Sequence, residues 1–298
     1  MALIGAGCAP VLMAAFFLFA NNFAPARFAF LGSSFIAAGT LGNIVSSQPL
    51  AAAIEAFGWR EVSWSLSVIT TFVGIGIWFT MRDPPRSAIA KGGQGGYLAL
   101  FKIPQLWPIF PCILLGYSVA AGIRGLWAGP LLADVYGLDT PGIGRQTLFM
   151  AIALSLGSLA YGPMDRFFDS RKYVILAGNS VVAFSTAWLA FYPPSSVWMA
   201  SLLLAMIGFF GSSFAVQLAH GKAFVPAHLI GRGVTLMNFF AIGGVGLMQF
   251  LSGFVVAANQ TPGQPAAAYQ AMFALYTAAL CLALMVYSFS SDARPSQT

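Results

Sequence analysis

The sequence predicts an all-α, polytopic membrane protein of about nine transmembrane helices. Hydrophobic residues make up 58% of the 298 residues and charged residues only 7%, and the mean hydropathy is +0.80. A soluble domain carries about 25% charged residues, so the 14 basic and 8 acidic residues are too few to cover a soluble surface of this size. The apolar runs are continuous and do not alternate with polar residues, which favours helices over a β-barrel.

Apolar windows of sufficient length give the individual elements. Nine spans are predicted, at residues 2–20, 29–53, 62–81, 107–133, 147–164, 173–192, 197–219, 233–257 and 268–289. A long polar stretch rich in Gly and Pro separates the third span from the fourth. We therefore expect a partial three-helix N-terminal bundle at 1–83, a cytoplasmic linker at 84–104 and a complete six-helix bundle at 105–298.

The distribution of charge predicts the orientation. If the N-terminus faces outward, the outer loops hold two basic residues, Arg60 and Arg145, and the inner loops hold eleven. These eleven are Arg27, Arg82, Arg86, Lys91, Lys102, Arg166, Arg171, Lys172, Lys222, Arg232 and Arg294. Lys and Arg concentrate in cytoplasmic loops, so we expect a bacterial inner-membrane protein with a cytoplasmic C-terminus.

An internal repeat supports this organisation. Phe23-Ala24-Pro25-Ala26 follows the first predicted span, and Phe224-Val225-Pro226-Ala227 follows the seventh. Each motif is followed by a basic or His residue and then by a Gly-bearing helix. Repeated three-helix units are typical of transporters. We expect the last six spans to form two such units, and the first three to be the second unit of another half whose opening part is absent.

Other kinds of site are disfavoured by composition. The net charge of +6 is scattered among loops, so nucleic acid binding is not expected. Cys8, Cys112 and Cys281 lie far apart in apolar runs, which is typical of buried free thiols and not of a metal or disulfide framework. We expect no cofactor and no metal; the expected partners are a small-molecule solute and membrane lipid.

Four stretches carry a resemblance to a known family. They are Gly39-Thr40-Leu41-Gly42 with Gly58-Trp59-Arg60; Asp83-Pro84-Pro85; residues 125–138; and Tyr161-Gly162-Pro163-Met164-Asp165-Arg166 with Arg171-Lys172. Together they resemble the major facilitator superfamily, and within it the sugar-phosphate/anion permease-like branch. The resemblance maps essentially the whole chain onto helices four to twelve of that fold, which implies that the first three helices are missing. Two departures concern the last motif: Gly162 is one residue too close to Asp165, and Asp169 occupies the place of the second Gly.

Arg124 is the sharpest candidate site residue. It lies deep in a predicted span, where a guanidinium costs ~2.5–3.5 kcal/mol on insertion scales and should face a cavity or a partner. Its planar fork can grip a carboxylate or phosphate. Snorkelling to the outer surface is the alternative. Asp134 is ~15 Å away along a helix, too far for a direct pair. The family resemblance agrees with the anchor, because organophosphate antiporters place an Arg on this helix, about one turn away.

Further candidate residues surround this position or lie at the inner face. Tyr117 is two turns from Arg124 on nearly the same helix face, and Trp127 is one turn beyond it. The remaining candidate solute ligands are Asn43, Gln48 and Gln217. By resemblance, Asp165, Arg166, Arg171 and Lys172 form a gating motif; simple positive-inside anchoring is the alternative for Arg171 and Lys172.

The sequence therefore predicts a secondary transporter for a small, anionic organic solute, with no enzymatic activity and with the coupling ion left open. Two alternatives stay open: an inactive or truncated fragment that needs the missing helices, and a transporter of the same fold for a neutral solute or drug. A membrane hydrolase is disfavoured, because Ser212, Ser213 and His220 lie on one helix without a Gly-flanked Ser elbow.

Overall fold

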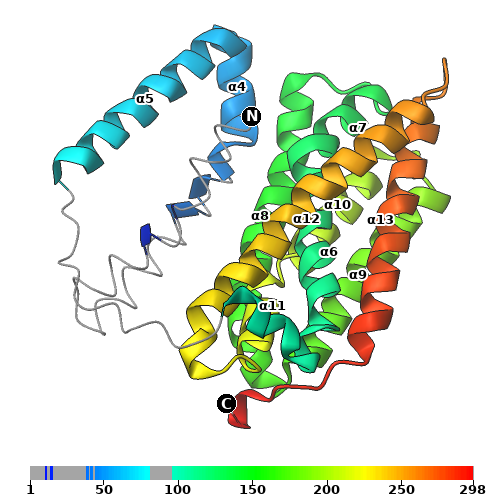
Figure 1. Ribbon diagram of the computed structural model, residues 1–298. Coiled ribbons are helices and arrows are strands. Elements are labelled where there is room, and N and C mark those ends of the chain that lie inside the picture. Colours follow the sequence, from blue (N-terminus) through cyan, green and yellow to red (C-terminus); the bar gives the residue numbers. More distant parts are fainter. Residues whose placement is uncertain are drawn as a thin grey trace. The chain divides into compact units, whose positions relative to one another are not determined.

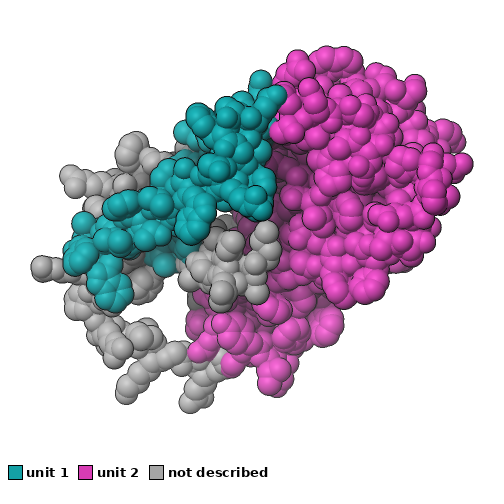
Figure 2. Space-filling model, turned by 90° about the horizontal axis from the view of Figure 1, so that it is seen from above, with its two compact units in different colours: residues 1–91 teal, residues 92–298 magenta. Residues whose placement is uncertain are grey.

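The computed structural model describes residues 44–80 and 96–297, together with positions 11, 14, 15, 38, 39, 41 and 42. Every regular element in these residues is a helix (Figure 1). The chain divides into two compact units, residues 1–91 and 92–298 (Figure 2). The predicted all-α fold class is confirmed.

Seven helical segments of the described residues are long and apolar enough to cross a membrane. They are Trp59–Thr80, Pro104–Asp134, Thr140–Phe167, Arg171–Phe191, Val197–Lys222, Ile230–Ala258 and Pro265–Ser288. Each matches a span predicted from sequence, usually with a few more residues at its ends. The predicted span 2–20 and most of the span 29–53 lie outside the described residues.

The bounded helices of the N-terminal unit are α4 (Gln48–Phe57) and α5 (Trp59–Thr80), which follow one another with Gly58 between them. The end of the predicted span 29–53 falls within α4, which begins at Gln48 after a turn and continues to Phe57. Pro49 explains the start, since Pro lacks a backbone N–H and fits only the first turn of a helix. Gly58 makes the connection with a φ of +87°, a conformation that favours glycine.

The C-terminal unit contains six membrane-spanning segments, some of them broken into two helices. Its α-helices are α6 (Ile109–Gly122), α7 (Ala128–Asp134), α8 (Thr140–Phe167), α9 (Arg171–Phe191), α10 (Val197–Phe210), α11 (Phe214–Lys222), α12 (Ile230–Ala258) and α13 (Pro265–Ser288). A π-helical turn, Ile123–Trp127, joins α6 to α7. Short 3₁₀ helices lie at Tyr97–Lys102, Pro104–Leu106, Ala227–Leu229 and Pro295–Gln297.

Helix pairing in this unit follows an internal two-fold pattern. The most extensive contacts join α6 to α12, α8 to α10, and α9 to α13. The six segments form two three-helix units: α6–α7, α8 and α9 in the first, and α10–α11, α12 and α13 in the second. The first segment of each unit pairs with the second segment of the other unit, and the two third segments pair with each other. Transporters built from repeated three-helix units have this exchange symmetry, so the pairing supports the repeat inferred from sequence.

Glycines permit two of these close pairings. A Cβ added at Gly244 of α12 would collide with the carbonyl oxygen of Leu114 on α6, and one at Gly157 of α8 would collide with that of Phe209 on α10. Within a membrane, helix association depends on close packing, because lipid is as apolar as the side chains. The two crossings therefore hold α6 and α10 at backbone contact with their partners.

Candidate functional site

Arg124 lies on the π-helical turn between α6 and α7. The backbone N–H of Ala128 donates to the carbonyl of Ile123, five residues earlier, where an α-helix would use the residue four earlier. Such an insertion shifts the following residues around the helix axis and is frequent at functional sites. Arg124 is half-buried between Gly122, which is buried, and Gly125, which is exposed. The π turn therefore sets how Arg124 projects from the helix, and the residue remains partly exposed.

Tyr117 lies on the same side of this helix. It is half-buried, and its phenol is close enough to the Arg124 guanidinium for the two groups to interact electrostatically. Its ring packs against Phe214 of α11, with ring centroids 5.5 Å apart. The structure thus brings together the two residues that the spacing of seven predicted to share a face.

Gln249 of α12 faces the same turn from the neighbouring helix. A Cβ at Gly125 would lie 3.6 Å from its Nε2 atom, and one at Gly122 would lie 3.8 Å from its Cγ atom. The two glycines therefore let this half-buried amide rest against the backbone next to Arg124. From the sequence, Gln249 is one of several polar residues within the predicted spans, and only the packing of α12 on α6 places it beside Arg124.

Trp127 closes the π turn and is tied to the opposite helices. Its indole Nε1–H donates to Ser252 Oγ of α12 at 2.8 Å, and its ring packs edge-on against Tyr269 of α13 with centroids 6.3 Å apart. Tyr269 in turn donates its hydroxyl to Asp134, at the end of α7. The polar atom of Trp127 is therefore engaged in helix–helix contact, and Asp134 is engaged by Tyr269.

Gln217 lies buried inside the bundle. It is 1% exposed and its amide donates to Ser213 Oγ at 2.9 Å, which also accepts from Asn179 of α9 at 3.1 Å. Both amides lie over Gly116 of α6, where a Cβ would collide with Gln217. Of the other predicted solute ligands, Asn43 lies outside the described residues, and Gln48 is exposed at the start of α4 in the separate N-terminal unit.

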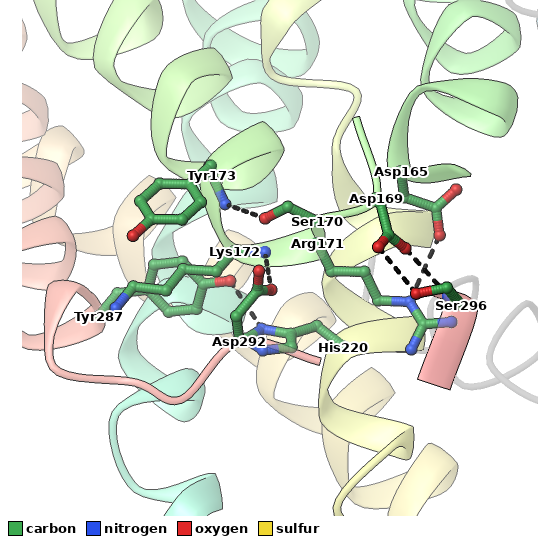
Figure 3. A network of polar contacts seen from close by, with 10 residues as sticks. All are labelled: Asp165, Asp169, Ser170, Arg171, Lys172, Tyr173, His220, Tyr287, Asp292 and Ser296. Carbon is green, nitrogen blue, oxygen red and sulfur yellow. Dashed lines mark hydrogen bonds and ion pairs between the residues drawn. The ribbon is translucent and has the colours of Figure 1, made fainter. Parts of the chain in front are cut away.

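The predicted gating residues gather at the turn between α8 and α9 (Figure 3). Arg171 Nε lies 3.3 Å from Asp165 Oδ2, and both side chains are largely buried. Arg166 is exposed on the same turn. Lys172 does not extend into solvent: its ammonium donates to the carbonyls of Ser288 at 2.6 Å and Ser290 at 2.7 Å.

The segment after α13 completes this network. Asp292 accepts the backbone N–H of Lys172 at 3.0 Å, and Asp169 accepts both the N–H and the hydroxyl of Ser296 (Figure 3). Burial raises the pKa of Asp292, but hydrogen bonds from Lys172 and Ser170 outweigh it and leave that pKa below the ordinary value. The Ser296 hydrogen bonds likewise lower the pKa of Asp169.

His220 and the serines near it have structural partners. His220 Nδ1 lies 2.7 Å from the Tyr287 hydroxyl, and Nε2 lies 2.9 Å from the carbonyl of Ser291. Ser212 donates to backbone carbonyls of Leu154 and Gly208. These partners leave no Ser–His pair of the kind considered from the sequence. Across 44–80 and 96–297, no group of three or more His, Cys, Asp or Glu side chains is arranged to hold a metal ion.

Comparison with known proteins places the chain in a family. Residues 1–240 match the Major Facilitator Superfamily. The chain is 23% identical over 209 residues to the membrane sensor protein UhpC of Escherichia coli K12, covering 61% of this chain and 46% of that protein. Two structures of the xylose transporter XylE of Escherichia coli share its fold.

Compared with the inward-open conformation of XylE, the chain has a TM-score of 0.52 and 20% sequence identity, and the match covers 66% of this chain and 49% of XylE. In the partially occluded inward-open conformation, the TM-score is 0.50 with 18% identity over 65% and 50%. The chain thus spans about half the length of these relatives. With its apolar helices, it is a multi-pass membrane protein. By the match over residues 1–240, the chain belongs to the Major Facilitator Superfamily.

Proposed function

We propose that this protein is a secondary transporter that moves a small, anionic organic solute across the bacterial inner membrane. The observation that carries the proposal is the half-buried Arg124 on a π-helical turn within a membrane-spanning segment. Guanidinium groups at membrane depth face protein cavities or water and mark solute pathways. Family membership supports a transport role in general, and Arg124 supplies the reason to name an anion.

The surroundings of Arg124 refine the class of solute. A guanidinium binds a carboxylate or phosphate through two parallel N–H bonds. Tyr117 and Gln249 add a hydroxyl and an amide beside it. These groups suit an anion that also carries a neutral hydrogen-bonding group, such as a phosphate ester or a hydroxy acid. We propose that Trp127 orients the turn and does not itself bind the solute, since its N–H is held by Ser252.

Alternating access is the mechanism that we propose for this solute. The chain divides into two compact units, residues 1–91 and 92–298, and this boundary falls inside the proposed linker 84–104. Solutes in this class of fold are released when one bundle rocks against another. The Asp165–Arg171 pair supports a gating role for the α8–α9 turn, together with Arg166 and Lys172. The excess of basic residues there supports a cytoplasmic location for this turn and for the C-terminus.

Solute sensing is a second candidate function. The curated relative that the chain matches over 209 residues is named a membrane sensor protein. A sensor would use the same Arg124 site to bind an anion, but binding would change the conformation without net movement of the solute. Both functions therefore require anion binding at Arg124, and only the transporter moves the anion across the membrane.

Counterflow in proteoliposomes tests the proposal. The protein, expressed from its native coding region, is reconstituted and offered radiolabelled phosphate esters, hydroxy acids and neutral sugars. We expect exchange of at least one anionic class and none of the neutral sugars. Binding of an anion without exchange would favour the sensor, and exchange of neutral sugars alone would overturn the anionic assignment.

A further inference from the structure

The residues after α13 are bonded to the turn that carries the proposed gate. We name residues 289–296 the terminal segment. Ser290 and Ala293 of this segment are buried, 4% and 7% exposed. Figure 3 shows Asp292 and Ser296 beside the α8–α9 turn, although they lie more than a hundred residues from it in sequence. A segment with this many partners is part of the folded unit.

Asp292 caps α9 from a distant part of the chain. The first backbone N–H groups of a helix have no partner within the helix, and a carboxylate there also meets the positive end of the helix dipole. Ser170 Oγ accepts the N–H of Tyr173 at 3.1 Å, and Asp292 Oδ1 accepts the N–H of Lys172 at 3.0 Å. Two of the open donors of α9 are thereby satisfied, one locally and one by the terminal segment.

Lys172 makes the reciprocal contact at the end of α13. The last carbonyls of a helix lack partners and carry the negative end of its dipole, so a cation is favourable there. The Lys172 ammonium donates to the carbonyls of Ser288, the last residue of α13, and Ser290. Lys172 therefore caps the end of α13, and Asp292, which follows α13, caps the start of α9. The two helices also pack closely along their length.

Asp169 shows that the turn is built around the terminal segment. Asp169 has a φ of +43°, a left-handed conformation that favours glycine. It is also the position where the family's loop motif carries its second Gly. The Asp side chain accepts two hydrogen bonds from Ser296, at 3.0 Å and 2.7 Å, which a glycine does not offer. The departure from the motif thus coincides with an anchor for the terminal segment.

We propose that the terminal segment positions the inner gate through two anchoring contacts: Asp292 of the segment with the Lys172 N–H at the start of α9, and Ser296 of the segment with Asp169 of the α8–α9 turn. Arg171, which pairs with Asp165, is the first residue of α9 and precedes the capped Lys172. Fixing the start of α9 therefore fixes the direction from which Arg171 meets Asp165. His220 joins α11 to the same segment through the Ser291 carbonyl. The gating consequence rests on the function proposed above; the positioning itself does not.

Hydrogen–deuterium exchange of the protein in nanodiscs tests the positioning. Asp292→Ala should raise the exchange rate of the amides at 169–173 by about threefold or more, because the Lys172 N–H loses its acceptor. The matched control is Asp139→Ala at the other end of α8, where Asp139 accepts the N–H of Gly142. That variant should raise exchange near 142 and leave 169–173 unchanged. Unchanged exchange at 169–173 in Asp292→Ala would overturn the proposal.

A second pair of variants keeps the test independent of folding defects. Asp169→Gly allows the positive φ but removes the Ser296 anchor, so exchange should rise at 294–296 with α8 and α9 still protected. If Asp169→Gly leaves 294–296 as protected as before, Asp169 is no anchor and the proposal fails. The transport consequence is separate: Asp292→Ala should slow counterflow, and combining it with Arg171→Gln should add little more. If the two substitutions slow counterflow additively, the terminal segment does not act through the Asp165–Arg171 gate. That result would leave the transporter assignment intact.

Discussion

Trp127 donates its indole N–H to the hydroxyl of Ser252 on α12, at 2.8 Å. Trp127 is the last residue of the π-helical turn, and Arg124 lies three residues before it. The hydrogen bond therefore fixes the end of the turn that also carries Arg124, the proposed solute anchor.

Removing this hydrogen bond should weaken solute binding without removing the ring. Trp127→Phe keeps an aromatic side chain but loses the N–H donor. A typical intramolecular hydrogen bond contributes about 0.5–1.5 kcal/mol, so we expect the dissociation constant of the anionic solute to rise about two- to tenfold. Ser252→Ala should match it, and the double variant should be no worse. Ligand-dependent thermal shifts give the dissociation constant for all three variants. If Ser252→Ala binds the solute normally while Trp127→Phe binds it more weakly, the hydrogen bond does not position the turn.

The α6–α12 crossing should be intolerant of any side chain at Gly244. Gly244→Ala places a Cβ against the backbone carbonyl of Leu114, and overpacking of this kind costs about 1–3 kcal/mol. Gly243→Ala is the matched control, because its Cβ would meet nothing within 4 Å. We expect the melting temperature to fall for Gly244→Ala and to hold or rise slightly for Gly243→Ala. Equal melting temperatures for the two variants would contradict the close approach.

The Asp165–Arg171 pair should show measurable coupling. The two side chains are 12% and 14% exposed, so the pair is better shielded from solvent than a surface ion pair. In a double-mutant cycle of Asp165→Asn and Arg171→Gln, we expect an interaction free energy of about 0.5–3 kcal/mol from thermal stability. The control cycle combines Asp165→Asn with Arg166→Gln, a change at an exposed arginine, and should give an interaction free energy near zero. Equal coupling in both cycles would argue against a specific pair.

The anchoring of the terminal segment should not change with pH in the neutral range. Because the pKa of Asp292 is lowered in the folded state, its ionised form stabilises the fold above the ordinary pKa of about 3.9. That contribution is lost only as pH falls through the still lower folded pKa. We expect the protection of the amides at 169–173, corrected for intrinsic exchange rates, to be equal at pH 6 and pH 8. A loss of protection toward pH 6 would show that Asp292 does not govern the contact.

Much of the fold follows directly from local sequence. The seven described spans match predicted apolar windows, because length and hydropathy alone decide whether a segment crosses a bilayer. The position of Arg124 within a span and its shared face with Tyr117 follow from helix periodicity. The π turn does not, because an apolar run has the same composition whether its hydrogen bonds span four residues or five.

The rest of the site depends on contacts between distant residues. Trp127 suits a solute site by type and position, yet its N–H meets Ser252, 125 residues later. Lys172 is interpretable from sequence as a positive-inside anchor, and its contacts with Ser288 and Asp292 depend on the pairing of α9 with α13. The glycine replaced by Asp169 was a local signal of something unusual, but only the fold identifies Ser296 as its partner.

Direct measurement of anion binding by Arg124 variants tests the central claim. An anion that exchanges in counterflow is titrated against the native protein, Arg124→Lys, Arg124→Ala and the control Arg145→Lys, whose side chain is exposed at the start of α8. We predict that both Arg124 variants lose affinity by tenfold or more, about 1.4 kcal/mol, because a lysine cannot form the two parallel bonds, whereas Arg145→Lys binds normally. Native affinity in both Arg124 variants would contradict the account.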